Sequence, residues 1–317
     1  MTPKFQSALG GQLSAFLSFK RSMGFAYQRP EGTLKNFDHF LHLLRLRSLR
    51  RLDWESVIQD WLQARPNRKP LSIATDLVVI RQFCLFRRRY DPKAFVPSPK
   101  WGPVHSDVHF VPYIFTAAEI RRMLRYLRRS PGRKGHRRCL RIMLLVLFCT
   151  GLRFGEVARL CLSDLDTGRR LFWVRQSKGR TRLVPFGRDL AEELRRYLKT
   201  RPNSCKTPAS ALFLNIRNQA HTVQSISFGL RGVFRKLGMK ADAGRAGPRP
   251  YDLRHSYAVH RLSRWHRQGV DVTLRLPWLS TYMGHANIVG TETYLTTTPE
   301  LMALASRRFE GRFRRRI

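Results

Sequence analysis

The chain has 317 residues, enough for two domains of ordinary size, and its hydrophobic fraction of 43% can fill buried cores. Lysine and arginine number 60 against 21 acidic residues, a formal net charge of +39. Repulsion on that scale opposes compaction unless a polyanion neutralises it, and nucleic acid fits better than an anionic membrane. The longest apolar run, from Ile142 to Cys149, is too short to cross a bilayer, and the N-terminus lacks a signal-peptide pattern. We therefore expect a cytoplasmic protein that binds nucleic acid and has no membrane partner.

The cysteines indicate neither disulfides nor a zinc site. Their number, 5, is odd, and no CxxC pair occurs, which argues against a disulfide framework and against a zinc ribbon or finger. Most of them lie among apolar residues, as small core side chains do.

The first part of the chain has apolar residues at helical spacing and no strand alternation. This spacing predicts helices at Phe5–Phe19, Leu34–Leu46, Trp54–Leu62 and Ile73–Phe86, with Asp53 as an N-cap. We expect residues 1–95 to form a helical domain. The proline-rich stretch 96–112 is predicted to be a linker, with an ordered loop as the alternative.

Residues 113–317 mix predicted helices with one hairpin and carry 42 basic against 13 acidic residues. Thr116 and Glu119 form a capping-box pattern, and Thr222 is a further N-cap. Strands are predicted at 171–175 and 182–185, around a turn that contains Lys178. Helices are predicted at 137–150, 153–160, 189–199, 222–237, 251–268, 272–283 and 289–295, with one more in the basic tail. The expected fold class is mainly α with a small β-sheet, namely an N-terminal helical domain followed by a mixed α/β domain.

Several polar residues of this second half could carry chemistry, but each has an ordinary structural explanation. Arg153 begins a helix, where backbone N–H groups attract anions, yet Glu156 three residues later could simply pair with it. Gly284 before His285 indicates a tight turn that presents an imidazole, although a single histidine is more often structural. Tyr294 alone would usually be half-buried packing.

The order and spacing of these residues give a stronger indication. The chain closely resembles the tyrosine recombinase (phage integrase) family over roughly residues 113–317. The matching segments are TGLRFGE (150–156), SKGRTRLVP (177–185), DLRHSYAVH (252–260), MGH (283–285) and TETYL (291–295). The resemblance identifies 1–95 as a core-binding, DNA-binding domain and 113–317 as a catalytic domain with a basic tail.

The resemblance implies a role for each matching residue. Arg153 and Arg254 would hold the non-bridging oxygens of a phosphodiester, and His285 would add a hydrogen bond to them. Tyr294 would attack phosphorus and leave a 3′-phosphotyrosine and a free 5′-hydroxyl. Lys178 would be the general acid for the departing oxygen.

The chemistry so implied needs no cofactor and no metal. The ester link keeps the energy of the broken bond, no GxxxxGK[ST] phosphate loop occurs, and cationic side chains do what Mg²⁺ would do. Glu156 matches the family's supporting carboxylate. Tyr251 departs from the family, which has histidine or lysine at this position. Tyrosine is a poor proton acceptor at pH 7, so either His255 compensates or proton transfer is slower.

We therefore predict an enzyme: a site-specific DNA recombinase of a mobile element that acts in integration, excision or transposition. Its partners would be double-stranded DNA with specific recombination sites and other subunits, as a homo-tetramer on DNA or with related recombinases. It would be nucleoid-associated in a bacterial cytoplasm when bound to DNA.

Three alternatives remain open at the level of sequence. The first is a catalytically weak DNA-binding accessory protein of the same fold, supported only by Tyr251. The second is a type IB topoisomerase, with the same chemistry in a monomer. The third is a metal-dependent nuclease or transposase, for which Asp164 and Asp166 are a close carboxylate pair in the second half.

Overall fold

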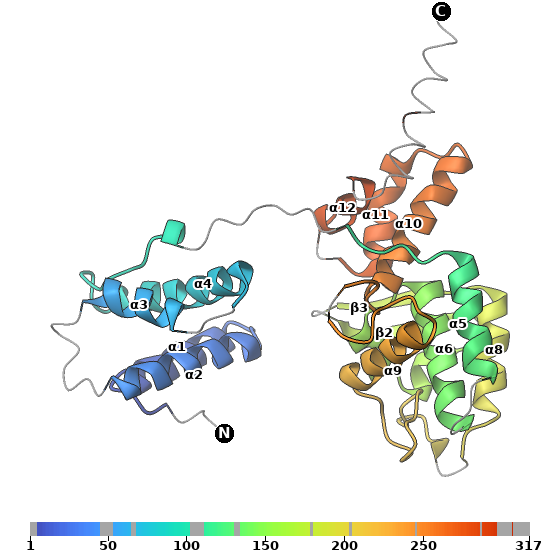
Figure 1. Cartoon of the computed structure of the whole chain (residues 1–317), viewed down its shortest axis with the longest axis horizontal. Coiled ribbons are helices and arrows are strands. Elements are labelled where there is room, and N and C mark those ends of the chain that lie inside the picture. The colour runs from blue at the N-terminus through green and yellow to red at the C-terminus, as the bar shows by residue number, and fades with distance from the viewer. Residues whose placement is uncertain are drawn as a thin grey trace, which may run out of the picture. The chain divides into compact units, whose positions relative to one another are not determined.

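The computed structural model of the chain forms two compact units, Met1–Val108 and His109–Ile317 (Figure 1). It describes residues 5–44, 53–64, 68–101, 111–129, 134–177, 180–202, 205–244, 246–285, 287–296 and Ser306. Over these residues, no helix has the length and apolar character needed to cross a membrane.

The first unit, where it is described, is a bundle of α-helices around one apolar core. Phe16 packs edge-on against Phe83 with 5.6 Å between ring centroids, and Phe37 against Trp61 with 5.0 Å. Burial of these large rings stabilises the bundle. The elements are α1 (Gly10–Ser22), α2 (Gln28–Leu43), α3 (Trp54–Gln63), α4 (Pro70–Arg87) and the 3-10 turn η1 (Pro99–Trp101).

The predicted starts of the first two helices are wrong. α1 begins at Gly10 rather than Phe5, and α2 begins at Gln28 rather than Leu34. Pro30 lies in the first turn of α2, where its missing N–H costs no intrahelical hydrogen bond, so the helix extends upstream of the apolar spacing. The predicted N-cap of α3 is confirmed, because the Asp53 side chain accepts from two backbone N–H groups of the first turn.

The second unit is built around the helix α6. Helices α5, α8, α9 and α10 all pack against it, and its residues Met143, Leu144 and Val146 are fully buried. Helices α10, α11 and α12 contact one another and lie together at one end of the unit (Figure 1). The helices are α5 (Ala117–Arg129), α6 (Lys134–Thr150), α7 (Phe154–Arg159), α8 (Arg188–Leu198), α9 (Val223–Lys236), α10 (Asp252–Arg267), α11 (Val272–Met283) and α12 (Val289–Thr296), with the 3-10 turn η2 (Leu162–Asp164).

Both N-caps predicted in the second unit are confirmed. The Glu119 carboxylate accepts from the Thr116 backbone N–H at 2.7 Å, and the Thr116 hydroxyl accepts from the Glu119 N–H at 3.2 Å. The Thr222 side chain accepts from the Ser225 N–H at the start of α9. These bonds satisfy N–H groups that a helix leaves open at its first turn.

The small sheet contains the predicted hairpin and one short additional strand. Its antiparallel order is β1-β2-β3, formed by Leu165–Asp166, Leu171–Ser177 and Arg180–Pro185. Phe172 and Val184 are fully buried, whereas the intervening Trp173 and Leu183 are about half exposed. This alternation places one face of the hairpin against the core.

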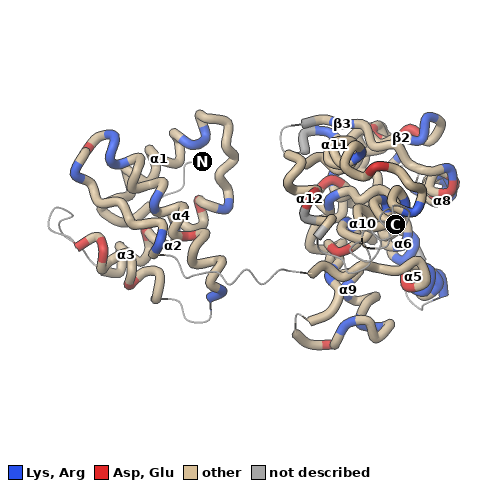
Figure 2. The backbone as a smooth tube through the Cα atoms, turned by 90° about the horizontal axis from the view of Figure 1, so that it is seen from above, with Lys and Arg blue, Asp and Glu red and all other residues tan. Residues whose placement is uncertain are grey.

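Basic residues occur in both units, with a dense run along α5 (Figure 2). Its exposed arginines are Arg121, Arg122, Arg125, Arg128 and Arg129. Unneutralised charge of this density favours a polyanionic partner.

Gly151 turns the chain at the end of α6. Its φ of +62° is in the left-handed region, and a Cβ at this position would lie 2.6 Å from Cδ1 of Tyr257. Only glycine avoids both the backbone strain and the overlap. The turn therefore fixes how α6 leads into the start of α7.

Gly151→Ala is expected to destabilise the second unit by about 1–3 kcal/mol, because alanine meets the Tyr257 ring in a strained backbone conformation. Urea unfolding of the full chain would measure the change. Gly232→Ala is the matched control, since its added methyl meets nothing within 4 Å and alanine favours the helix. An unchanged unfolding midpoint for Gly151→Ala would mean that this turn relaxes freely.

Candidate active site

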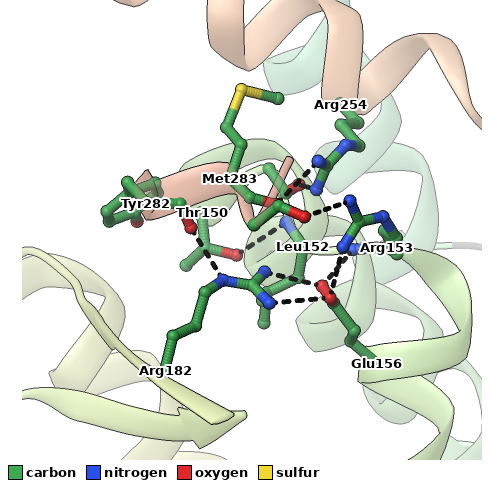
Figure 3. A network of polar contacts seen from close by, with 10 residues as sticks. Thr150, Leu152, Arg153, Glu156, Arg182, Arg254, Tyr282 and Met283 are labelled. Carbon is green, nitrogen blue, oxygen red and sulfur yellow. Dashed lines mark hydrogen bonds and ion pairs between the residues drawn. The ribbon is translucent and has the colours of Figure 1, made fainter. Parts of the chain in front are cut away.

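The C-terminus of α11 is held by three arginines from distant parts of the chain (Figure 3). Each donates to one of three consecutive backbone carbonyls. The pairs are Arg182 Nε with Tyr282 O at 2.8 Å, Arg254 Nη2 with Met283 O at 2.7 Å, and Arg153 Nη2 with Gly284 O at 2.6 Å. Carbonyls at a helix end have no intrahelical partner and carry the negative end of the helix dipole, so cations stabilise them. These bonds gather three guanidinium groups around one turn.

Glu156 is the carboxylate at the centre of this cluster. Its side chain is 1% exposed and accepts from both nitrogens of the Arg182 fork, at 2.9 and 3.0 Å. It also accepts from Arg153, through Nη1 at 2.9 Å and the backbone N–H at 2.8 Å. One buried carboxylate thus orients two arginines.

Arg182 was not among the residues singled out from the sequence. A signal for it was present, because strand alternation puts Arg182 on the same face of β3 as the buried Val184. A charged residue at an inward position requires a partner, and Glu156 supplies it.

Arg254 is buried in α10, with 1% of its surface exposed. Its Nη1 donates to the Gly151 carbonyl at 2.6 Å, which links α10 to the turn before α7. Its Nε has no hydrogen-bond partner within the described part of the chain. Burial and the nearby charge of Arg153 lower the pKa of Arg254. Two guanidinium groups therefore repel each other within a largely dehydrated site.

Tyr294 lies on α12 and is 5% exposed. Its ring stacks on His285 with 6.2 Å between centroids and meets His255 edge-on at 5.4 Å. Burial raises the pKa of the Tyr294 phenol, while the charge of Arg254 opposes that rise. The phenol is thus held within electrostatic reach of a buried cation.

His285 follows the glycine that ends α11. Gly284 has a φ of +70°, and a Cβ on it would lie 2.7 Å from the Arg182 guanidinium. The tight turn predicted before His285 is therefore present. The imidazole Nδ1 is 2.7 Å from the hydroxyl of Thr291, which is fully buried on α12. Thr291 belongs to the TETYL segment, but no role for it was predicted from the sequence.

Tyr251 and His255 lie at the start of α10, beside the same cluster. Tyr251 is 45% exposed, and its ring meets the His255 ring edge-on at 5.2 Å. Burial lowers the pKa of His255 to about 4, so its imidazole is neutral at pH 7. Lys178, predicted at the hairpin tip, lies outside the described residues.

The carboxylates considered for a metal have local partners. Asp164 accepts from Arg175 Nε at 2.6 Å and from the Cys161 N–H at 3.0 Å. Asp166 accepts from the N–H groups of Gly168 and Arg169 in the turn that follows. Where the chain is described, no three histidine, cysteine, aspartate or glutamate side chains are grouped so as to hold a metal ion.

Comparison with known proteins places this geometry in a family. Residues 114–300 match the model of the phage integrase family. A putative integrase/recombinase, y4rB of Sinorhizobium fredii, is 31% identical over 94% of this chain and 96% of its own length. The tyrosine recombinase XerA of Thermococcus kodakarensis is 30% identical over 60% of each chain.

Solved structures share the fold at low sequence identity. The Tn1549 transposon integrase in complex with circular intermediate DNA has a TM-score of 0.67 and 17% identity, over 94% of this chain and 99% of that chain. The XerH site-specific recombinase bound to palindromic difH substrate has a TM-score of 0.66 and 17% identity, over 88% of this chain and 78% of that chain. Since the family model covers more than half of the sequence and a relative matches nearly all of it, the chain belongs to the phage integrase family of tyrosine recombinases.

Proposed function

We propose that this protein is a site-specific DNA recombinase that cuts and rejoins duplex DNA through a covalent bond to Tyr294. The observation that carries the proposal is that the guanidinium groups of Arg153 and Arg254 meet at adjacent carbonyls of one turn, beside that buried phenol. Like charges in a dehydrated site are stabilised by a bound anion, and a phosphodiester is the anion that a tyrosine nucleophile attacks.

The bound phosphate would be held by donors that the helix turn has already oriented. Arg254 Nε, buried and without a hydrogen-bond partner in the described structure, is the donor that we assign to a non-bridging oxygen. Arg153 would add a second cationic donor and His285 a third hydrogen bond. Fixed donors stabilise the charge that develops in the transition state without reorganising.

In the proposed reaction the Tyr294 phenol oxygen attacks phosphorus and loses its proton. The bond between phosphorus and the 5′-oxygen breaks, which leaves a 3′-phosphotyrosine, and the departing oxygen takes up a proton to become a 5′-hydroxyl. We assign that proton to Lys178 as general acid. Attack by a 5′-hydroxyl on the phosphotyrosine reverses the step and reseals the DNA without a nucleotide cofactor.

The acceptor of the phenol proton is where this chain differs from its family. We assign to Tyr251 a hydrogen bond toward the phosphate. We assign the role of proton acceptor to His255, whose neutral imidazole lies beside Tyr294. A pKa of about 4 makes His255 a weak base, so we expect slow proton transfer.

The domain assignment extends the proposal to DNA binding. We assign residues 1–95 to a core-binding domain, 96–112 to a linker and 113–317 to the catalytic domain with its basic tail. The net charge of +39 and the exposed arginines support contact with a DNA backbone. The solved fold relatives named above are bound to DNA.

The biological setting is part of the proposal. We propose that four copies, or copies with related recombinases, act on two sites of a mobile element at a bacterial nucleoid. Two relatives described above, an integrase/recombinase and a tyrosine recombinase, support this setting. Sequencing the DNA that flanks the gene would identify the element and its ends.

Tyr294→Phe is expected to abolish the covalent protein–DNA adduct on a nicked suicide substrate, because the attacking oxygen is removed. A denaturing gel with labelled DNA would measure the adduct. Tyr251→Phe keeps the Tyr294 oxygen and loses only the hydrogen bond that we assign toward the phosphate, so it should still form the adduct, but more slowly. If the adduct survives Tyr294→Phe and disappears in Tyr251→Phe, the nucleophile is Tyr251. If the wild-type protein binds its site but forms no adduct, the accessory-protein alternative is favoured.

Arg254→Lys is expected to slow cleavage by about 100- to 1,000-fold, because lysine keeps the charge but cannot replace three oriented donors. DNA binding should change little, since many other basic groups contact the backbone. Arg264→Lys, at an exposed position of the same helix, is the control. Normal cleavage by Arg254→Lys would contradict the assignment of Arg254 as a donor to the phosphate. Loss of DNA binding would also contradict it, provided that the melting curve of the variant shows a folded protein.

The stability of the protein is expected to fall between about pH 6.5 and pH 4 in part because of His255. Its pKa drops from 6.5 to about 4 on folding, so in this range the unfolded chain binds a proton that the folded chain does not. One such group contributes a slope of at most about 1.4 kcal/mol per pH unit. Urea unfolding at several pH values should show a smaller slope in His255→Gln and no change in the exposed control His39→Gln. Equal slopes in all three proteins would exclude this effect.

A further inference from the structure

We propose that Thr291 is a positioning residue that sets the tautomer of His285 and couples it to the helix of the nucleophile. The inference rests on the proposed function and deepens it. It starts from the 2.7 Å contact between the Thr291 hydroxyl and His285 Nδ1.

The contact is buried and joins two separate elements. His285 lies in the turn after α11, whereas Thr291 is on α12 and is 0% exposed. Thr291 precedes Tyr294 by three residues, so both side chains lie on nearly the same side of α12. One hydrogen bond therefore links the imidazole to the helical turn that carries the phenol.

The chemistry of a phosphate oxygen fixes the direction of this hydrogen bond. A non-bridging oxygen only accepts, so if His285 binds it through Nε2, the nitrogen that does not contact Thr291, Nε2 must carry the proton. A neutral imidazole has one N–H, and Nδ1 must then accept. The Thr291 hydroxyl can donate to it, whereas a backbone carbonyl at the same place would require the opposite tautomer. A hydroxyl at this place therefore stabilises the phosphate-binding form of the imidazole when it donates, which a carbonyl cannot do.

The same bond fixes the orientation of the ring. The His285 ring stacks on Tyr294 with 6.2 Å between centroids and 24° between planes. Rotation of the imidazole would lose both this stacking and the contact with Thr291. The branched side chain of threonine has few rotamers in a helix, so its hydroxyl is held in place. Thr291 thus keeps the His285 imidazole, which donates to the phosphate, at a fixed position relative to the Tyr294 phenol.

The first test compares Thr291→Val with Thr291→Ser in single-turnover cleavage of a suicide substrate by the full chain. Valine keeps the shape and removes the donor, so cleavage should slow by about 10- to 100-fold. Serine keeps the hydroxyl and should restore the rate to within about 3-fold of the wild type, a loss of under 1 kcal/mol in transition-state stabilisation. Thr281→Val is the control, because its hydroxyl bonds the Pro277 carbonyl at an exposed site. A wild-type rate in Thr291→Val would overturn the proposal.

A double-mutant cycle separates positioning of the imidazole from a general effect on α12. In a His285→Gln background, adding Thr291→Val should slow cleavage further by less than about 2-fold, because the imidazole is already absent. If valine slows cleavage by the same factor in both backgrounds, Thr291 acts on the fold or on Tyr294, and the proposal fails.

A spectroscopic test requires neither cleavage nor a folded valine variant. Nitrogen NMR of the histidine-labelled full chain should show His285 with its proton on Nε2, the signal being identified by its loss in His285→Gln. Thr291→Ser should keep that tautomer. Finding the proton on Nδ1 in the wild type would overturn the proposal. A protein with the expected tautomer that forms no adduct would contradict the proposed function and leave the role of Thr291 as tautomer setter intact.

Discussion

The structure of the site depends on one constraint, the unsatisfied carbonyl groups at the end of α11. Three guanidinium groups satisfy them, and these come from the start of α7, from β3 and from α10. Because each arginine is tied to a different carbonyl, the helix end brings together segments that are far apart in the chain. The turn that presents His285 is held by the same bonds.

This arrangement also explains why the site is electrostatically suited to an anion. Among the described groups at this turn, Glu156 is the carboxylate that pairs with Arg153 and Arg182, whereas Arg254 donates to the carbonyls of Gly151 and Met283. Positive charge therefore exceeds negative charge in a site with little access to water. Burial makes the excess costly, and it makes a bound phosphate correspondingly favourable. The same burial raises the pKa of Tyr294, which the charge of Arg254 partly offsets.

Much of the local structure was predictable because its causes are local. Asp53 and Thr222 cap helices as expected, since a cap needs only a side-chain oxygen and the next few N–H groups. The strands of the hairpin followed from alternation, and the mainly α fold class is confirmed. The start of α2 was missed because a proline in the sequence indicates the end of a helix, although it is tolerated in the first turn. Arg182 was missed because its partner Glu156 lies in a different element, and Thr291 because its contact with His285 depends on how the turn after α11 folds against α12.

The family, the mainly α fold class and the residue types available at the site follow from the amino-acid sequence. Which of these residues meet depends on the folded chain: Arg182 with Glu156, Thr291 with His285, and Arg254 with a carbonyl 103 residues away. Hydrogen bonds between different helices, strands and turns leave no periodicity or spacing in the sequence. Its geometry is set by the packing of α10, α11 and α12 against one another, which depends on the whole unit.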